Sequence, residues 1–284
     1  MATFTNQATL SYGDTVITSN VVTGEWQQAV SVTKTALDNT YMADSLLTYV
    51  VSIVNEGSTP LTGLTLTDDL GAYGGGATTV TPLTYAEGTL TYFVNGARAA
   101  ELIVTDTEPL TATGISVPAG GSGVIIYQAA ANAYASPVAG GSITNTATVS
   151  GGSLPAPISA SATVTAATEA YLTISKALSP ATVSEGDRLT YTFVIRNFGN
   201  TAVVATDDAT VTDTFNPILS DLAVTYNGTA WTEGVEYTYD GTTGQFATLP
   251  SNILVPAATY TRDPATGAWT VTPGVSTLSV VGTV

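Results

Sequence analysis

Apolar and polar residues alternate along most of this 284-residue chain, and turn residues separate the alternating segments. The run Val-Ser-Val-Thr-Lys34 is one example, and 27 glycines and 13 prolines interrupt such runs at short intervals. Alternation with a period of two residues is typical of β-strands that bury one face, and the period of an α-helix is almost absent. The pattern predicts an all-β protein, and this length accommodates two β-sandwiches of roughly 100 to 150 residues each.

Two parts of the chain repeat one pattern of residues in the same order. Each copy begins with a lysine in a predicted strand, and these are the only two lysines of the chain. A tyrosine, an asparagine and a glycine follow at equal spacing, and an aspartate ends a later strand. The matched residues are Lys34 and Lys176, Tyr49 and Tyr191, Asn55 and Asn197, Gly57 and Gly199, and Asp68 and Asp213. A repeat of this kind predicts two similar domains.

The two copies end differently. The first continues through a strand around Asn145 to a closing strand that ends at Val164, whereas the second passes a turn at Pro273-Gly274 and ends at Val284 without either strand. Matching segments stand at the beginning of the chain, where residues 4–9 resemble 143–148 and residues 16–22 resemble the closing strand.

We therefore predict two tandem sandwiches, the second lacking its last strands, and an N-terminal donor β-hairpin. The hairpin covers residues 1–24, the complete β-sandwich residues 28–167, and the incomplete acceptor β-sandwich residues 168–284. This order of segments, a donor hairpin followed by a complete and then an incomplete sandwich, predicts a homopolymer in which each hairpin adds to the open edge of the neighbouring subunit.

Strand alternation places several polar side chains in the predicted cores. Lys34 shares its face with Val30 and Val32, Asp68 lies on an apolar face, and Asn145 stands between inward-facing neighbours. An unpaired ammonium is costly to bury, and burial lowers the pKa of a lysine and raises that of an aspartic acid. Each lysine is therefore expected to be neutral, paired or consumed in a reaction.

Composition narrows the classes of function. A net charge of -16, with six Lys plus Arg, disfavours binding to nucleic acid or to anionic membranes. The chain has no cysteine for a disulfide and no histidine, the usual general base and metal ligand. We expect no cofactor, no metal and no conventional enzyme activity. Asp68-Asp69 and Asp207-Asp208 are interpreted as solvated turns, because no twelve-residue calcium loop surrounds them.

In order and spacing, these motifs resemble the repeats of bacterial surface proteins catalogued as "domain of unknown function 11". The motifs are the strand lysine, Tyr-x-x-x-x-x-Asn-x-Gly, the Thr-Asp strand and Thr-Asn-x-Ala-Thr, the last around Asn145 and Asn6. The resemblance implies immunoglobulin-like β-sandwiches on a cell surface. Similar sandwiches in Gram-positive pili and adhesins can join a lysine to an asparagine, with a buried carboxyl group as catalyst.

Carried onto this sequence, the resemblance implies two autocatalytic isopeptide bonds, each formed in a single turnover. One joins Lys34 to Asn145 within a chain, with Asp68 as catalyst. The other joins Lys176 of one subunit to Asn6 of the next, with Asp213 as catalyst. Two alternatives stay open: a buried lysine–aspartate ion pair with a hydrogen-bonded asparagine, and a hairpin that closes on the second sandwich of its own chain.

The expected function is that of a major structural subunit of a self-assembling bacterial surface fibre, such as a pilus or a spore appendage. We expect an extracellular location on a bacterial cell or spore, and no signal peptide or apolar span of 20 residues is visible. A tip adhesin or an anchor protein would be a further partner. The alternatives are a passive stalk or adhesin fragment of a larger surface protein, and a sugar-binding platform built on Trp231 and Trp269.

Overall fold

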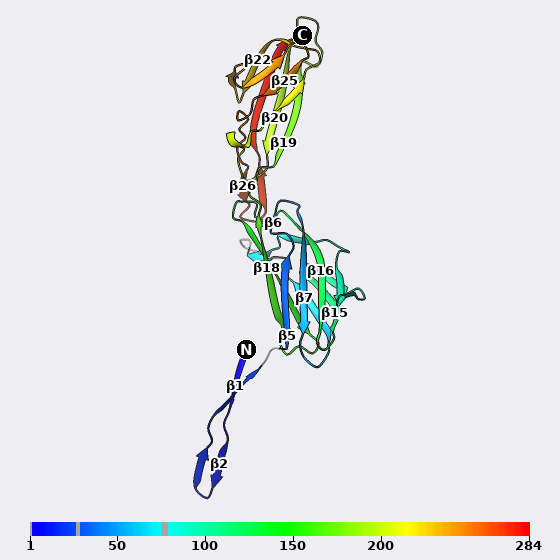
Figure 1. The fold of residues 1–284 in the computed structure, drawn as a ribbon, viewed down its shortest axis with the longest axis vertical. Helices are drawn as coiled ribbons and strands as arrows, with labels where there is room; N and C mark the ends of the chain where they lie inside the picture. Colours follow the sequence, from blue (N-terminus) through cyan, green and yellow to red (C-terminus); the bar gives the residue numbers. More distant parts are fainter. Residues whose placement is uncertain (1, 27–28, 75–78) are drawn as a thin grey trace.

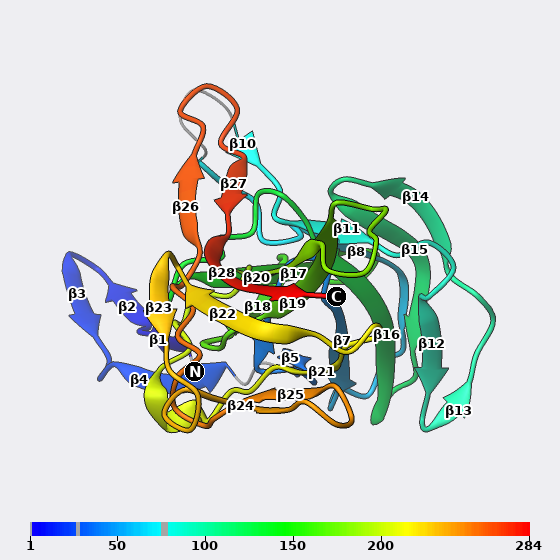
Figure 2. The same ribbon diagram turned by 90° about the horizontal axis from the view of Figure 1, so that it is seen from above.

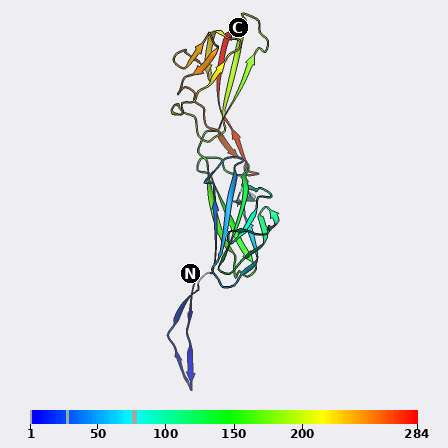
Figure 3. The ribbon, with the colours of Figure 1, turned by 45° about the vertical axis from the view of Figure 1, so that its right-hand side comes forward.

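The structure is a computed structural model that describes residues 2–26, 29–74 and 79–284, and nearly all regular elements in these ranges are β-strands. One short 3-10 helix, η1 (Ala205–Asp207), is the exception among them. A hairpin and two β-sandwiches follow one another along the long axis of the molecule (Figures 1 and 3). The prediction of an all-β protein with two tandem β-sandwiches, the second without its last strands, is confirmed.

The hairpin is built from two consecutive ladders. Strand β1 (Ala2–Asn6) pairs with β4 (Val22–Trp26), and β2 (Thr9–Tyr12) pairs with β3 (Thr15–Thr18). Neither ladder joins a sheet of the sandwiches, and the hairpin stands clear of them in Figure 1. The sequence predicts one strand over residues 16–22, and the structure breaks it between β3 and β4. The hairpin exposes the apolar side chains Phe4, Leu10, Tyr12, Val16, Ile17 and Val22.

The first sandwich consists of two six-stranded sheets. In one sheet the order is β13-β12-β16-β7-β5, with β11 also paired to β16, and in the other it is β14-β15-β8-β17-β18-β6. The short strands β9 and β10 pair with each other. The strands are β5 (Val30–Ala36), β6 (Thr40–Tyr41), β7 (Leu46–Asn55), β8 (Leu61–Asp68), β9 (Tyr73–Gly74), β10 (Thr79–Val80), β11 (Leu83–Tyr85), β12 (Thr91–Val94), β13 (Ala97–Arg98), β14 (Ile103–Thr107), β15 (Leu110–Val117), β16 (Gly121–Ala131), β17 (Ser142–Gly151) and β18 (Ile158–Ala166).

The second sandwich has a five-stranded sheet facing a three-stranded one. Their orders are β19-β20-β28-β22-β23 and β21-β25-β24. Among the described residues, the small sheet contains no counterpart of β17 or β18, so its edge strand β21 has no partner there on the side where β8 pairs with β17. The strands are β19 (Leu172–Ser179), β20 (Arg188–Asn197), β21 (Thr212–Thr214), β22 (Ser220–Tyr226), β23 (Thr229–Trp231), β24 (Tyr237–Asp240), β25 (Gln245–Thr248) and β28 (Gly274–Thr283).

Each sandwich has its own core, filled by alternate residues of its strands. Tyr49, Val51 and Ile53 of β7 have no exposed surface, whereas the residues between them are partly exposed. In the second sandwich, Leu189, Tyr191, Phe193 and Ile195 of β20 follow the same rule. The two clusters of buried residues share no member, so each sandwich buries apolar surface independently of the other.

A further hairpin of the second sandwich reaches back to the first. Strands β26 (Thr259–Arg262) and β27 (Trp269–Thr272) pair with each other and project to one side when the molecule is seen end-on (Figure 2). The Trp269 amide donates a hydrogen bond to the Ala133 carbonyl, and the Arg262 guanidinium lies 5.2 Å from the ring centre of Tyr73. This hairpin therefore holds the two sandwiches in contact.

The hairpin also corrects the predicted turn at Pro273-Gly274. The Asn55 amide donates to the carbonyl of Pro118, and the Asn197 amide donates to the carbonyl of Pro256. Pro256 is thus the counterpart of Pro118, and strands β26 and β27 form an insertion between Pro256 and the start of β28.

Candidate functional site

Lys34 lies on β5 and points into the core between the two sheets of the first sandwich. Its Nζ is 2.5 Å from Oδ2 of Asp68, at the end of β8, and neither side chain has exposed surface. The other carboxylate oxygen, Oδ1, accepts a hydrogen bond from the Leu70 amide at 3.0 Å. A buried ion pair of this kind is tolerated because each charge has a close partner.

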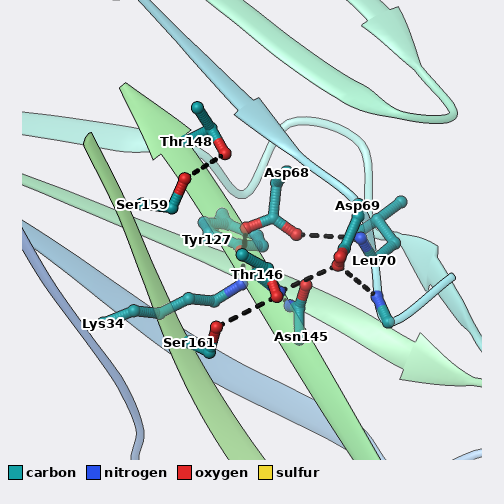
Figure 4. Close-up of polar contacts among 11 residues, drawn as sticks. Lys34, Asp68, Asp69, Leu70, Tyr127, Asn145, Thr146, Thr148, Ser159 and Ser161 are labelled. Carbon is teal, nitrogen blue, oxygen red and sulfur yellow. Dashed lines mark hydrogen bonds and ion pairs between the residues drawn. The ribbon is translucent and has the colours of Figure 1, made fainter. Parts of the chain in front are cut away.

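Tyr127 connects this pair to Asn145. The Tyr127 hydroxyl, on β16, donates a hydrogen bond of 2.5 Å to Oδ2 of Asp68 and accepts one of 3.3 Å from Nδ2 of Asn145. Figure 4 shows the Lys34 side chain reaching toward Asp68 and Asn145, with Tyr127 beside them. Oδ1 of Asn145 is buried and receives no hydrogen bond from the described part of the chain, so the amide is held from one side only.

The ladder of the second sheet places Asn145 beside the pair. Strand β17 runs antiparallel to β8 with Ala147 opposite Asp68, and Asn145 precedes Ala147 by two residues and so shares its face. Strand β18 then pairs with β17, with Ala162 opposite Asn145, and packs along β5. The last two strands of the sandwich therefore supply the amide and also cover the lysine.

Burial sets the protonation of this site. Loss of water lowers the pKa of Lys34 from 10.5 to about 8, although the Asp68 carboxylate acts in the opposite direction. Burial, together with the negative charge of Asp68, raises the pKa of Tyr127 well above its usual value. The ring of Tyr49, whose centre is 4.9 Å from Nζ, closes one side of the site. An appreciable fraction of Lys34 is therefore neutral near neutral pH.

This arrangement can carry out acyl transfer between two side chains. A neutral Lys34 amine can attack Cγ of Asn145, the Cγ–Nδ2 bond can break, and ammonia can leave as the Nζ–Cγ bond forms. Asp68 can take a proton from the amine, and the Tyr127 hydroxyl lies where a proton must reach Nδ2. Fixing the reactants side by side supplies roughly 7 to 11 kcal/mol in favourable cases, so no cofactor is required.

The second sandwich contains two of the three predicted groups. Lys176 on β19 and Asp213 on β21 form an ion pair, and the Lys176 ammonium lies 4.3 Å from the ring centre of Tyr191. Unlike Lys34 and Asp68, these side chains retain 39% and 18% of their surface exposed. Every residue of β19 is exposed, because no strand in the described part of the chain takes the place that β18 has over β5.

The two sites also differ at the tyrosine that joins aspartate to asparagine. Tyr127 pairs across strands with Tyr49, whereas Val280 pairs with Tyr191. A valine thus occupies the position of the connecting hydroxyl in the second sandwich. For this reason, comparison of the two repeats does not identify Tyr127 as a site residue. Only its position in the alternating pattern of an apolar strand predicts that it is buried.

Asn6, the third predicted group of the second site, lies at the opposite end of the molecule. It is exposed on β1 and pairs with Val22, as Asn145 pairs with Ala162. Figure 1 places the hairpin beyond the first sandwich, away from the second. The structure therefore brings Lys34, Asp68 and Asn145 together, but it does not bring Asn6 to Lys176 and Asp213 of the same chain.

The other predicted features have simpler places in the fold. Trp231 stacks on Tyr226 with ring centres 4.8 Å apart, and Trp269 lines a groove between the sandwiches together with Tyr73 and Tyr134. Within the described ranges, no group of three acidic residues is arranged to hold a metal ion. The same ranges contain no helix with the length and apolar character needed to cross a membrane.

The comparisons with known proteins concern the fold. No protein-family model and no curated protein matches the sequence. Among solved structures, the major pilin subunit BcpA of Bacillus cereus is 13% identical, with a TM-score of 0.35 over 95% of this chain and 73% of that one. The pilus backbone RrgB of Streptococcus pneumoniae is 10% identical, with a TM-score of 0.36 over 86% of this chain and 55% of that one. The collagen-binding domain of a Staphylococcus aureus adhesin is 14% identical, with a TM-score of 0.30 over 49% of this chain and 99% of that one.

Proposed function

We propose that this protein is the major structural subunit of a bacterial surface fibre, on a cell or a spore, in which the hairpin of each subunit completes the second sandwich of the next. One observation carries the proposal: the second sandwich lacks two strands, and the hairpin presents two paired strands with the same residue pattern. Within one chain the first sandwich lies between them (Figure 1). The pairing is therefore assigned to neighbouring subunits.

The first sandwich provides the register of this pairing. Ala147 lies opposite Asp68 and Val149 opposite Leu66, so the matching hairpin residues Ala8 and Leu10 would lie opposite Asp213 and Val211. Asn6 would then occupy the place of Asn145, beside Lys176. Strand β21 offers the unpaired edge that such an addition requires.

Exposed apolar side chains on both surfaces support the association. On β19, the exposed fractions of Leu172, Ile174 and Leu178 are 40%, 56% and 50%. On the hairpin, those of Leu10 and Ile17 are 63% and 49%. Complete burial of one such side chain is worth about 1.5 to 3 kcal/mol, so a few of them stabilise the docked hairpin. Neighbouring exposed apolar side chains are typical of an interaction site.

We further propose that both isopeptide bonds form. Lys34 and Asn145 would join the first and the penultimate strands of one sandwich, with Asp68 as the catalytic carboxyl. Lys176 and Asn6 would join consecutive subunits, with Asp213 in the corresponding role. The fibre would then be covalently continuous, and the reaction would be a single-turnover step of assembly with no other substrate.

The test is a boiled denaturing gel and an intact-mass measurement on the full-length chain and on Asn6→Ala. The wild type should give a ladder of multiples of the 28.9 kDa chain, lighter by one ammonia for each bond. Asn6→Ala should still associate, but its ladder should collapse on boiling. Asn20→Ala, an exposed asparagine outside the hairpin ladders, is the matched control and should retain the ladder.

Deleting residues 1–24 should leave a folded monomer. The sandwiches should still fold because the hairpin shares neither a sheet nor a core cluster with them, and the chain should stay monomeric because no hairpin is left to complete a neighbouring subunit. A wild-type chain that stays monomeric at every concentration would instead be a passive stalk fragment. Normal fibres from the deletion variant would overturn the donor-hairpin proposal.

A further inference from the structure

The two lysine sites differ in one respect that bears on when each reacts. We infer that the second site is latent in the free subunit and becomes reactive when the returning strands of an incoming hairpin, β3 and β4, cover Lys176. The inference rests on the proposed function and adds a regulatory role for the half of the hairpin that does not carry Asn6.

The first sandwich shows what the covering strand does. Lys34 and Lys176 occupy matching positions, and each lies against an aspartate and a tyrosine ring. Lys34 has no exposed side-chain surface because β18 packs along β5, whereas 39% of the Lys176 side chain is exposed. Strand β17 supplies the asparagine, and β18 excludes water from the amine.

Exclusion of water decides whether the amine is a nucleophile. An ammonium in contact with water keeps its proton, and beside an aspartate it remains an ion pair. Burial of Lys34 lowers its pKa from 10.5 to about 8, which raises the neutral fraction at pH 7 by roughly two to three orders of magnitude. Covering Lys176 in the same way would remove water from an amine whose side chain is 39% exposed in the free subunit.

Val22 is the hairpin residue placed to provide this cover. It pairs with Asn6 as Ala162 pairs with Asn145, so its side chain lies on the same face as the reacting amide. Ala162 is buried in the first sandwich, whereas 57% of Val22 is exposed in the free hairpin. Docking would therefore bring the amide and the cover to Lys176 in one step, and an asparagine that arrives without the cover would meet an unreactive lysine.

Full-length Val22→Ser tests the inference, with Thr23→Ser on the opposite face of β4 as the matched control. Both side chains are exposed in the free subunit, so neither change should disturb folding. Association is followed by light scattering, and the covalent bond by the rate at which boil-resistant dimers form. The rate is compared at concentrations where all variants have assembled to the same extent. We expect Val22→Ser to associate but to form the bond at least tenfold more slowly, and Thr23→Ser to match the wild type.

A second measurement reports on the cover directly. An amine-acetylating reagent should modify Lys176 in dilute, unassembled Asn6→Ala protein, and assembly of that variant should protect Lys176. If assembled Val22→Ser forms the bond at the wild-type rate, or if Lys176 is equally accessible before and after assembly, the inference is overturned while donor-hairpin assembly stands. If neither variant nor the wild type associates, the proposed function fails, and this inference fails with it.

Discussion

The substitution Asn145→Ala should remove the bond within the first sandwich and lower the stability of that sandwich alone. The proposed bond joins residues 34 and 145 and thus closes a loop of about 110 residues. In the chain-entropy treatment of crosslinks, a loop of this length stabilises the folded state by about 5 kcal/mol. For a domain near 140 residues, 1 kcal/mol corresponds to roughly 3 °C in Tm, so the transition should fall by about 15 °C.

Calorimetry on a chain without residues 1–24 measures this effect without assembly. The two cores share no residue, so the second sandwich unfolds as an internal control and its transition should stay in place. Intact mass should show that Asn145→Ala has not lost ammonia. Lys34→Met should lower the same transition by a similar amount, and the double variant should add little, because each change removes one shared bond. If the losses of stability in the two single variants add up in the double variant, or if the parent chain has its full calculated mass without loss of ammonia, the residues form only a noncovalent pair.

Three further predictions address the residues around this bond. Tyr127→Phe removes the hydroxyl that joins Asp68 to the amide, and should slow ammonia loss during refolding by about 100-fold, as followed by mass spectrometry. In Asn145→Ala, the free Lys34 amine binds a proton less readily than in the unfolded chain, because its pKa is lowered to about 8. Stability should therefore rise by about 2 kcal/mol between pH 7.5 and 9.5 in urea titrations, and removal of the lysine should abolish the rise. Trp269→Ala removes a side chain that lines the groove between the sandwiches, so the sandwiches should be held less firmly and X-ray scattering should show a broader range of molecular dimensions. Both calorimetric transitions should stay unchanged, because Trp269 belongs to neither core.

Strand alternation was sufficient to predict the sandwiches and the inward positions of Lys34, Asp68 and Asn145, because a period of two residues assigns each side chain to a face. It was not sufficient for Tyr127. Its neighbours on the same face of β16, Ile125 and Ala129, are apolar, and its counterpart Val280 has no hydroxyl, so neither alternation nor the repeat distinguishes it from an ordinary core residue.

The insertion at strands β26 and β27 was missed for a different reason. A proline–glycine pair at residues 273–274 satisfies the local rules for a turn, but the true counterpart of Pro118 is identified by a hydrogen bond from Asn197, far away in the sequence. Similarly, the sequence shows that Asn6 matches Asn145, but the exposure of Lys176 depends on which strands are absent from its sandwich.

The proposed crosslink within the first sandwich would have a mechanical consequence. In the proposed fibre, a pull along the axis would enter the first sandwich near β5 and leave it after β18, which leads into the second sandwich (Figure 1). If Lys34 is bonded to Asn145 as proposed, the force would pass directly from β5 to β17, and the residues between positions 34 and 145 would carry no load. Unfolded, that segment would lengthen each subunit by up to roughly 350 Å. The bond would thus prevent most of the first sandwich from unfolding when the fibre is stretched. The fibre would then return to its resting length when the tension is released.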